Sequence, residues 1–235
     1  MKILVTGSAR GLGRHLAVDL GLEGHEVIVH YRSSRNAARS AVAAIREGGG
    51  RAHFVGADVT APAEVEAMAD VIRAEVGGLD ALVNNVGQFI LKRLDDLTVQ
   101  EWDTQIASTV SATYYVTRAM LPMLRDGGGR IINISDSGAD RLSARPRSLP
   151  YYVGKTGVLI VTRTMAVTEA RYGITVNAVL PGALENSDPS PGVAQIPARR
   201  HGRFEDVSAA VRFLLGDQTD YISGSFIQVG GGWNL

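Results

Sequence analysis

Tyr151 and Lys155 stand four positions apart at the head of an apolar segment, and this pair is the strongest candidate for a reaction centre. On a helix, that spacing puts a phenol and an ammonium on one face, about one turn apart. The cation is expected to favour the ionised phenol and so to lower its pKa, which is about 10 in free tyrosine. A tyrosine tuned in this way can transfer a proton near neutral pH. The same spacing also arises by chance in helices where the ring is packed and the amine is solvated.

A glycine-rich turn near the start of the chain supplies a second candidate site, and it runs Thr6-Gly7-Ser8-Ala9-Arg10-Gly11-Leu12-Gly13. Its three glycines allow the backbone to approach a pyrophosphate closely and to deliver it to the positive end of a following helix. Because the turn lies between a predicted strand and an amphipathic helix, it predicts dinucleotide binding. The alternative is a tight turn that binds nothing.

Short β-branched runs alternate with longer helical patterns along the chain. Strands are predicted at residues 2–5, 26–31, 52–56, 81–84, 130–134, 175–180 and 225–229, and helices at 12–23, 36–47, 62–76, 98–124, 151–172 and 205–215. This alternation predicts a single α/β domain over residues 1–235, a Rossmann-like, doubly wound sheet of seven mostly parallel strands flanked by helices. Ligands of such folds bind beyond the carboxyl ends of the strands.

Composition limits the partners of the chain. Lysine plus arginine equal aspartate plus glutamate at 24 each among 235 residues, so no overall field favours nucleic acid or an anionic membrane. The absence of cysteine excludes thiolate sites, and the five histidines lack ligand-like spacing, so no metal is expected. No apolar run reaches the roughly 18 residues of a membrane span, and no signal-peptide core is present. We expect a cytoplasmic protein that binds a small-molecule substrate.

Four motifs, in order, resemble those of the short-chain dehydrogenase/reductase superfamily across essentially the whole chain. They are the glycine-rich turn, Asn84-Asn85-Val86-Gly87, Tyr151-x-x-x-Lys155 and Pro181-Gly182. The resemblance implies an oxidoreductase in which Tyr151 gives a proton to the developing substrate anion and Lys155 binds the nicotinamide ribose. The residues it assigns to the cofactor are Gly7, Arg10, Gly11, Leu12, Gly13, Arg32, Ser33, Ser34, Asp58, Val59, Asn85, Val86, Gly87, Tyr151, Lys155, Pro181 and Gly182.

The segment after the second strand favours NADP over NAD as the cofactor. An NAD site usually places an acid there for the ribose 2′-hydroxyl, whereas an NADP site offers cations and hydroxyls to the 2′-phosphate. Here Arg32, Ser33 and Ser34 follow the strand without an acid, and Arg10 matches an arginine of NADP-using relatives. Asp58 matches the family position that contacts adenine, or it is a capping aspartate.

Asp136 departs from the family pattern, because it stands where a serine normally orients the substrate carbonyl. Asp136 and Tyr151 are 15 positions apart, two more than usual in the family, so Ser137 takes the serine role if the register slips. Pteridine reductases of the superfamily also carry an aspartate there, and they use a phenylalanine at the position of Phe89 to stack a pterin on the nicotinamide. Gly11 replaces their arginine, and Thr109 replaces the family asparagine that holds a relay water.

Three functions therefore stay open. The first is an NADPH-dependent reductase acting on a pterin-like C=N bond, with Tyr151, Lys155 and Asp136 as catalytic residues and Phe89 and Ser137 facing the substrate. The second is a carbonyl reductase of the 3-oxoacyl-(acyl-carrier-protein) reductase type. The third is an NADP-binding sensor without turnover.

The resemblance also implies a homodimer or homotetramer. Family members usually pair through the helix at 98–124 and the helix that begins with Tyr151. Gly154 and Gly157 would allow close helix contact at such an interface, and residues 230–235 are placed to cross to a neighbour.

Overall fold

Seven parallel strands form one sheet in the computed structural model, which describes residues 1–234. The strands are β1 (Lys2–Val5), β2 (Glu26–Tyr31), β3 (Arg51–Gly56), β4 (Ala81–Asn84), β5 (Gly129–Ile134), β6 (Ile174–Pro181) and β7 (Phe226–Val229). Their order is β3-β2-β1-β4-β5-β6-β7, and every neighbouring pair is parallel. The order reverses between β1 and β4, which is the switch point where doubly wound sheets bind ligands.

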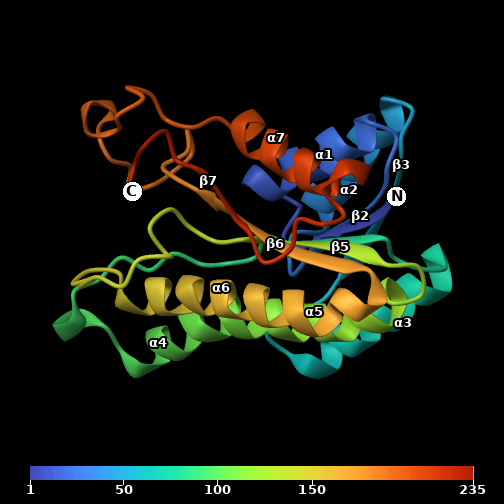
Figure 1. The fold of residues 1–235 in the computed structure, drawn as a ribbon, viewed down its shortest axis with the longest axis horizontal. Helices are drawn as coiled ribbons and strands as arrows, with labels where there is room; N and C mark the ends of the chain where they lie inside the picture. The colour runs from blue at the N-terminus through green and yellow to red at the C-terminus, as the bar shows by residue number, and fades with distance from the viewer. Residues whose placement is uncertain (235) are drawn as a thin grey trace.

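Helices cover both faces of the sheet (Figure 1). One face carries α1 (Gly11–Leu22), α2 (Arg35–Glu47) and α7 (Phe204–Leu215), and the other carries α3 (Pro62–Val76), α4 (Val99–Ile106), α5 (Ala112–Leu124) and α6 (Leu149–Glu169). Successive strand residues enter opposite cores, as the period of two requires: Ile3 and Val83 join one apolar cluster, whereas Leu4 and Leu82 join the other. Because both faces of these strands are buried, their sequences are almost continuously apolar.

The predicted fold class is confirmed: the chain forms a single α/β domain with seven strands in one sheet. The sheet is wholly parallel rather than mostly parallel. The predicted helix over 98–124 is interrupted by a π-helical segment, Ala107–Ser111, because the sequence periodicity alone does not reveal a local change of hydrogen-bond register. Leu235, the end of the expected C-terminal crossing segment, lies outside the described residues.

Gly154 and Gly157 serve contacts within the chain, where the sequence predicted contacts between subunits. A Cβ atom at Gly154 would lie 2.9 Å from Cβ of Thr109, and one at Gly157 would lie 3.0 Å from Cγ2 of Val110. The π-helical segment therefore packs directly on the backbone of α6. This close approach fixes the start of α6, where Tyr151 and Lys155 lie.

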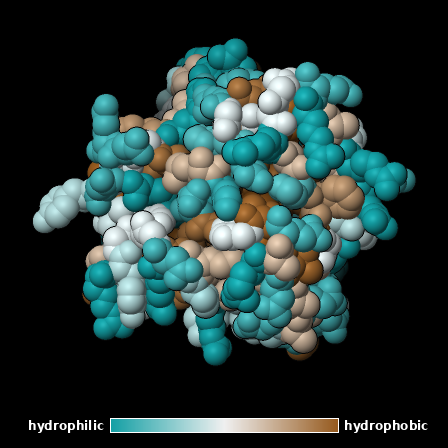
Figure 2. Space-filling view, turned by 90° about the vertical axis from the view of Figure 1, so that its right-hand side faces the viewer, coloured by the Kyte–Doolittle hydropathy of each residue, from teal (hydrophilic) through white to brown (hydrophobic). Residues whose placement is uncertain are grey.

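The surface at the right-hand end of Figure 1 is mainly hydrophilic. Teal side chains dominate this view, and hydrophobic residues form small patches separated by polar ones (Figure 2). None of the helices within residues 1–234 combines the length and the apolar character of a membrane span.

Candidate active site

The four sequence motifs meet at the carboxyl edge of the sheet. The glycine-rich turn follows β1, residues 85–87 follow β4, Asp136 follows β5 and Pro181 ends β6. Because the strands are parallel and adjacent in the order β1-β4-β5-β6, these four segments lie next to one another. The first turns of α6 bring Tyr151 and Lys155 to the same edge.

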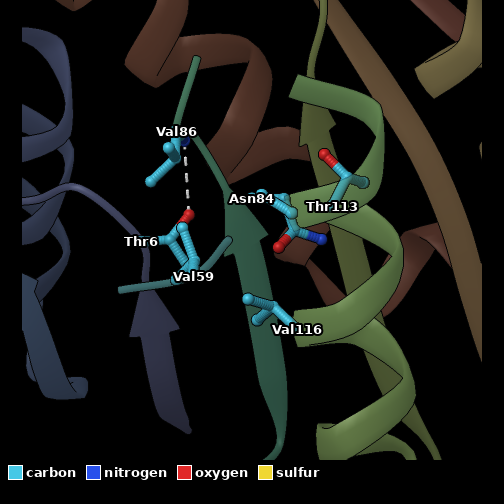
Figure 3. A pocket seen from close by; sticks show the side chains of 7 residues that line it. Thr6, Val59, Asn84, Val86, Thr113 and Val116 are labelled. Atoms are coloured by element: carbon cyan, nitrogen blue, oxygen red, sulfur yellow. Dashed lines mark hydrogen bonds between the residues drawn. The ribbon is translucent and has the colours of Figure 1, made fainter. Parts of the chain in front are cut away.

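The glycine-rich turn is locked onto the segment after β4. The Thr6 hydroxyl accepts hydrogen bonds from the backbone N–H groups of Asn85 (2.9 Å) and Val86 (3.3 Å), the second of which is drawn in Figure 3. Gly7 has a φ of +62°, which favours glycine, and a Cβ at Gly13 would lie 2.5 Å from both Asn85 Nδ2 and the Gly7 carbonyl oxygen. Gly13 therefore lets the start of α1 pack directly against Asn85 and the Gly7 backbone.

A small cavity lies between this turn and α5. It is lined by Thr6, Val59, Asn84, Val86, Ala112, Thr113 and Val116, which come from the ends of β1, β3 and β4 and from α5 (Figure 3). The Asn84 amide donates hydrogen bonds to Thr117 and to Asn133, and the Asn133 amide donates to Thr162. These buried hydrogen bonds join α5, β4, β5 and α6, so they fix the positions of these four elements relative to one another.

His30 is a structural residue that sequence reasoning missed. It is buried, its Nδ1 lies 2.9 Å from the Gly7 backbone nitrogen and its Nε2 lies 3.0 Å from the Ala57 carbonyl oxygen. Because the Gly7 N–H donates, Nδ1 must accept and Nε2 must carry the proton. Burial lowers the pKa of His30, so the neutral ring joins the ends of β1, β2 and β3. The feature of the sequence that could have indicated this role is the position of His30 near the end of a predicted strand.

Two guanidinium groups are accessible near the ends of β1 and β2. The Arg32 side chain is 58% exposed, and Nη1 lies 4.0 Å from Oδ2 of Asp58. Hydrogen bonds from the hydroxyl and backbone N–H of Thr60 hold the pKa of Asp58 below its usual value. Arg10 is also exposed, immediately before α1. Cations at these positions suit a phosphate group beside the second strand.

Tyr151 and Tyr152 both donate to one carboxyl group. The Tyr151 hydroxyl lies 2.8 Å from Oδ2 of Asp136, and the Tyr152 hydroxyl lies 2.9 Å from Oδ1. Lys155 is buried, and its ammonium donates to the Ile134 carbonyl oxygen at 2.8 Å while lying 5.8 Å from the centre of the Tyr151 ring. The structure thus brings all three predicted catalytic residues together.

The electrostatics of this cluster differ from the expectation for Tyr151. Burial and the neighbouring Asp136 carboxylate raise the pKa of Tyr151, whereas the sequence predicted that Lys155 would lower it. The reason is geometric: the phenol contacts a carboxylate, and Lys155 is bound to a backbone carbonyl instead. Burial also raises the pKa of Asp136 and lowers the pKa of Lys155 to about 8.

Phe89 lies beside the reaction centre, and Ser137 faces away from it. The Phe89 ring is 46% exposed and meets the Tyr151 ring edge-on, with centroids 4.7 Å apart. The Ser137 hydroxyl is buried and donates to the Trp233 carbonyl oxygen at 2.5 Å. Asp136, rather than Ser137, therefore contacts the Tyr151 hydroxyl.

Gln105 and Asn186 are two further residues that the sequence did not single out. The fully buried Gln105 amide donates to the Gln88 carbonyl oxygen at 2.6 Å and to the Thr109 hydroxyl at 3.0 Å, so it fixes the segment that carries Phe89. Asn186 Nδ2 lies 3.6 Å from the Cβ position at Gly11. Neither residue belongs to a motif, since each acts through a contact between distant segments.

Two further predicted positions, Gly182 and Gly87, pack closely against other parts of the chain. A Cβ at Gly182 would lie 2.8 Å from Cα of Gly230, and one at Gly87 would lie 3.3 Å from Nζ of Lys155, so both glycines allow close packing. Within residues 1–234, no cluster of three or more histidine, aspartate or glutamate side chains is arranged to hold a metal ion.

Comparisons with known proteins agree with this geometry. A family profile described as enoyl-(acyl carrier protein) reductase matches residues 7–234. The chain is 35% identical over 245 residues to 3beta-hydroxysteroid dehydrogenase 1 of Eggerthella lenta, covering 99% of this chain and 93% of that protein. It is 36% identical over 239 residues to the 3-oxoacyl-(acyl-carrier-protein) reductase FabG of Staphylococcus epidermidis, covering 97% of each. The chain belongs to the short-chain dehydrogenase/reductase family.

A solved structure supports the same assignment. The landomycin C-6 ketoreductase LanV with bound NADP and rabelomycin is 30% identical to this chain, with a TM-score of 0.90, and covers 99% of this chain and 96% of its own. The protein is accordingly an oxidoreductase of this family with a Rossmann fold.

Proposed function

We propose that the protein is an NADPH-dependent reductase that converts a carbonyl group to an alcohol, with Tyr151 as the proton donor. The observation that carries the proposal is the Tyr151 hydroxyl, held by Asp136 at 2.8 Å beside buried Lys155, at the carboxyl edge of the sheet. The names of the two relatives and of LanV describe a hydroxysteroid dehydrogenase, a 3-oxoacyl reductase and a ketoreductase, which favours a carbonyl substrate.

NADP is the proposed cofactor because the chain offers cations where the adenosine phosphate would lie. Arg32 and Arg10 are exposed after β2 and before α1, and Ser33 and Ser34 stand beside them. The glycine-rich turn leads from β1 into the N-terminus of α1, a position that suits a pyrophosphate. LanV binds NADP, and this supports the same choice here. Asp58, Val59 and Asn85 to Gly87 would line the adenine and ribose side of the same crevice.

Different residues of the chain would have different roles in the reduction. Reduced nicotinamide supplies the hydride when the cofactor is bound. Tyr151 supplies a proton to the oxygen on which negative charge develops, and Lys155 provides positive charge beneath it. Asp136 holds the Tyr151 hydroxyl before substrate binds, so this hydrogen bond must be exchanged for one to the substrate oxygen. Pro181 and Gly182 would form the wall against the carboxamide.

A pterin-like C=N substrate is the second candidate. Two observations favour it: the exposed Phe89 ring lies against Tyr151, and Asp136 is a carboxyl group whose pKa is raised by burial. A protonated carboxyl can donate to a ring nitrogen, and an exposed aromatic ring can stack on a flat heterocycle.

A substrate screen separates these candidates. NADPH oxidation should be followed with 3-oxoacyl thioesters, cyclic ketones, dihydropterins and folates at equal concentration. We expect turnover with the carbonyl compounds alone. Turnover with the pterins alone would reject the carbonyl proposal, and NADPH binding without turnover of any compound would favour a cofactor-binding sensor.

A homodimer or homotetramer completes the proposal. Val153, Ile160 and Val167 recur every seven residues on α6 and are 42%, 64% and 80% exposed, so they form an apolar stripe along one side of the helix. Tyr114 on α5 is also 42% exposed. A monomeric mass in solution at micromolar concentration would reject this oligomer.

A further inference from the structure

Tyr152 makes a contact that neither the motif nor the proposed reaction assigns to it. Its hydroxyl donates to Oδ1 of Asp136 at 2.9 Å, while Tyr151 donates to Oδ2 at 2.8 Å. Each oxygen of the Asp136 carboxyl group therefore holds one phenol. The two rings meet edge-on, with their centroids 5.4 Å apart.

The Tyr152 ring is held from several sides. The guanidinium carbon of Arg145 lies 3.7 Å from the ring centroid, and Nη2 of Arg145 donates to the Gly138 carbonyl oxygen at 2.7 Å. The amide of Asn234 reaches the Tyr152 hydroxyl at 3.5 Å. The ring also packs against an apolar cluster that includes Leu159 and Leu180. A side chain fixed in this way presents its hydroxyl at a constant position.

We propose that Tyr152 is a positioning residue that occupies Oδ1 of Asp136 and so reserves Oδ2 for the proton exchanged with Tyr151. This role rests on the proposed reductase function. When Asp136 is ionised, both phenols donate to it and the Tyr151 proton points away from the substrate. When Oδ2 takes up a proton from water, Asp136 donates to the Tyr151 oxygen, and the Tyr151 hydroxyl is released to donate to the substrate.

The charged and titratable groups that face Asp136 are Tyr151, Tyr152 and Lys155 from α6 and Arg145 from the loop before it. The phenols donate to the ionised carboxylate and the two cations attract it, so all four favour the charged form against burial. Removing the Tyr152 hydroxyl takes away one donor to that form. The pKa of Asp136 must then rise.

The test compares Tyr152→Phe with wild type in two independent measurements. The first is the pKa of the Asp136 carboxyl carbon, followed by carbon-13 NMR and assigned by its loss in Asp136→Asn. We expect a rise of about one pH unit, because a hydrogen bond to a charged group is lost. The second is kcat for carbonyl reduction. Without the Tyr152 hydroxyl the added proton can settle on Oδ1, where it leaves Tyr151 bound to Oδ2, so kcat should fall roughly tenfold while the NADPH dissociation constant stays within about twofold.

Tyr221→Phe is the matched control, because it also removes one tyrosine hydroxyl, but from a fully exposed residue. It should leave the pKa of Asp136 and kcat unchanged. An unchanged Asp136 pKa in a folded Tyr152→Phe protein would overturn the proposal, since a purely structural role lowers the melting temperature without moving that pKa.

Two further outcomes are decisive. If Tyr152→Phe does not fold, the folded wild type carries the test through the carbon-13 shift of Tyr152 Cζ. That shift should change with the same midpoint as the Asp136 carboxyl carbon, because the Tyr152 hydroxyl donates to Oδ1, and a Tyr152 shift that does not follow the Asp136 titration overturns the role. If wild type binds NADPH but reduces no carbonyl compound, the proposed function fails. The NMR titration still decides the hydrogen-bond role of Tyr152 in that case.

Discussion

Asp58 and Asp136 occupy equivalent places in the sheet and have opposite properties. Each comes two residues after a parallel strand, β3 in one case and β5 in the other. Thr60 donates to Asp58 twice and lowers its pKa, whereas burial raises the pKa of Asp136. In the proposed reductase, Asp58 would be a fixed acceptor on the cofactor side and Asp136 a titratable group on the substrate side. Cofactor recognition and proton transfer would then use different segments of the same edge of the sheet.

The largest effect should come from Tyr151→Phe, which tests the substrate side. We expect kcat for reduction to fall about 10³-fold, because the variant lacks the proton donor. NADPH binding, measured by quenching of protein fluorescence, should stay within a few-fold of wild type. Turnover at the wild-type rate would reject Tyr151 as the acid.

Arg32→Ala tests the cofactor side and should have the next largest effect. We expect the NADPH dissociation constant to rise roughly 30-fold, because a charge-assisted contact to the 2′-phosphate is lost. The NADH dissociation constant should change only a few-fold. Equal losses for both cofactors would contradict the phosphate assignment.

Asp136→Ser tests whether the serine that the family normally carries can replace Asp136 on the substrate side. A serine hydroxyl can both accept from Tyr151 and donate to a carbonyl oxygen, so carbonyl reduction should remain within about tenfold of wild type. Asp58→Ser is the matched change on the cofactor side, and it should alter the NADPH dissociation constant rather than the pH profile. Complete loss of carbonyl reduction in Asp136→Ser would show that a hydroxyl cannot replace the carboxyl group at this position.

The smallest predicted effect is a shift in pH dependence. Lys155 has a pKa lowered to about 8, so it is charged below that pH and loses its charge as the pH rises through 8. The value of kcat/KM for NADPH should therefore fall above pH 8. The Asp136 carboxylate raises the pKa of Lys155, so Asp136→Ser should move this fall to lower pH. A profile that stays flat to pH 10 would contradict the buried ammonium.

The fold and the cofactor side were readable from the sequence because their signals are local. Alternating periodicity places the strands, and the requirement for glycine at 7 follows from its positive φ within one turn. The tyrosine and lysine are linked by helical spacing, which also needs no tertiary information. These features are fixed by residues close together in the chain.

The contacts on the substrate side could not be predicted, because each joins distant segments. The raised pKa of Tyr151 depends on burial and on a carboxylate 15 positions away, and the neighbouring Tyr152 contact arises from the same loop. Gln105 acts through the backbone of residues 88 and 90. The family resemblance showed that Asp136 is unusual at its position, but not that two phenols would share it.

The most direct test of the central claim follows the hydride itself. NADPH with deuterium at both positions of nicotinamide C4 should be incubated with the protein and a reactive 3-oxoacyl thioester or ketone, and the product examined by mass spectrometry and NMR. We expect one deuterium on the new carbinol carbon, and about 10³-fold slower transfer in Tyr151→Phe. Tight NADPH binding with no deuterium transferred to any carbonyl compound would contradict it.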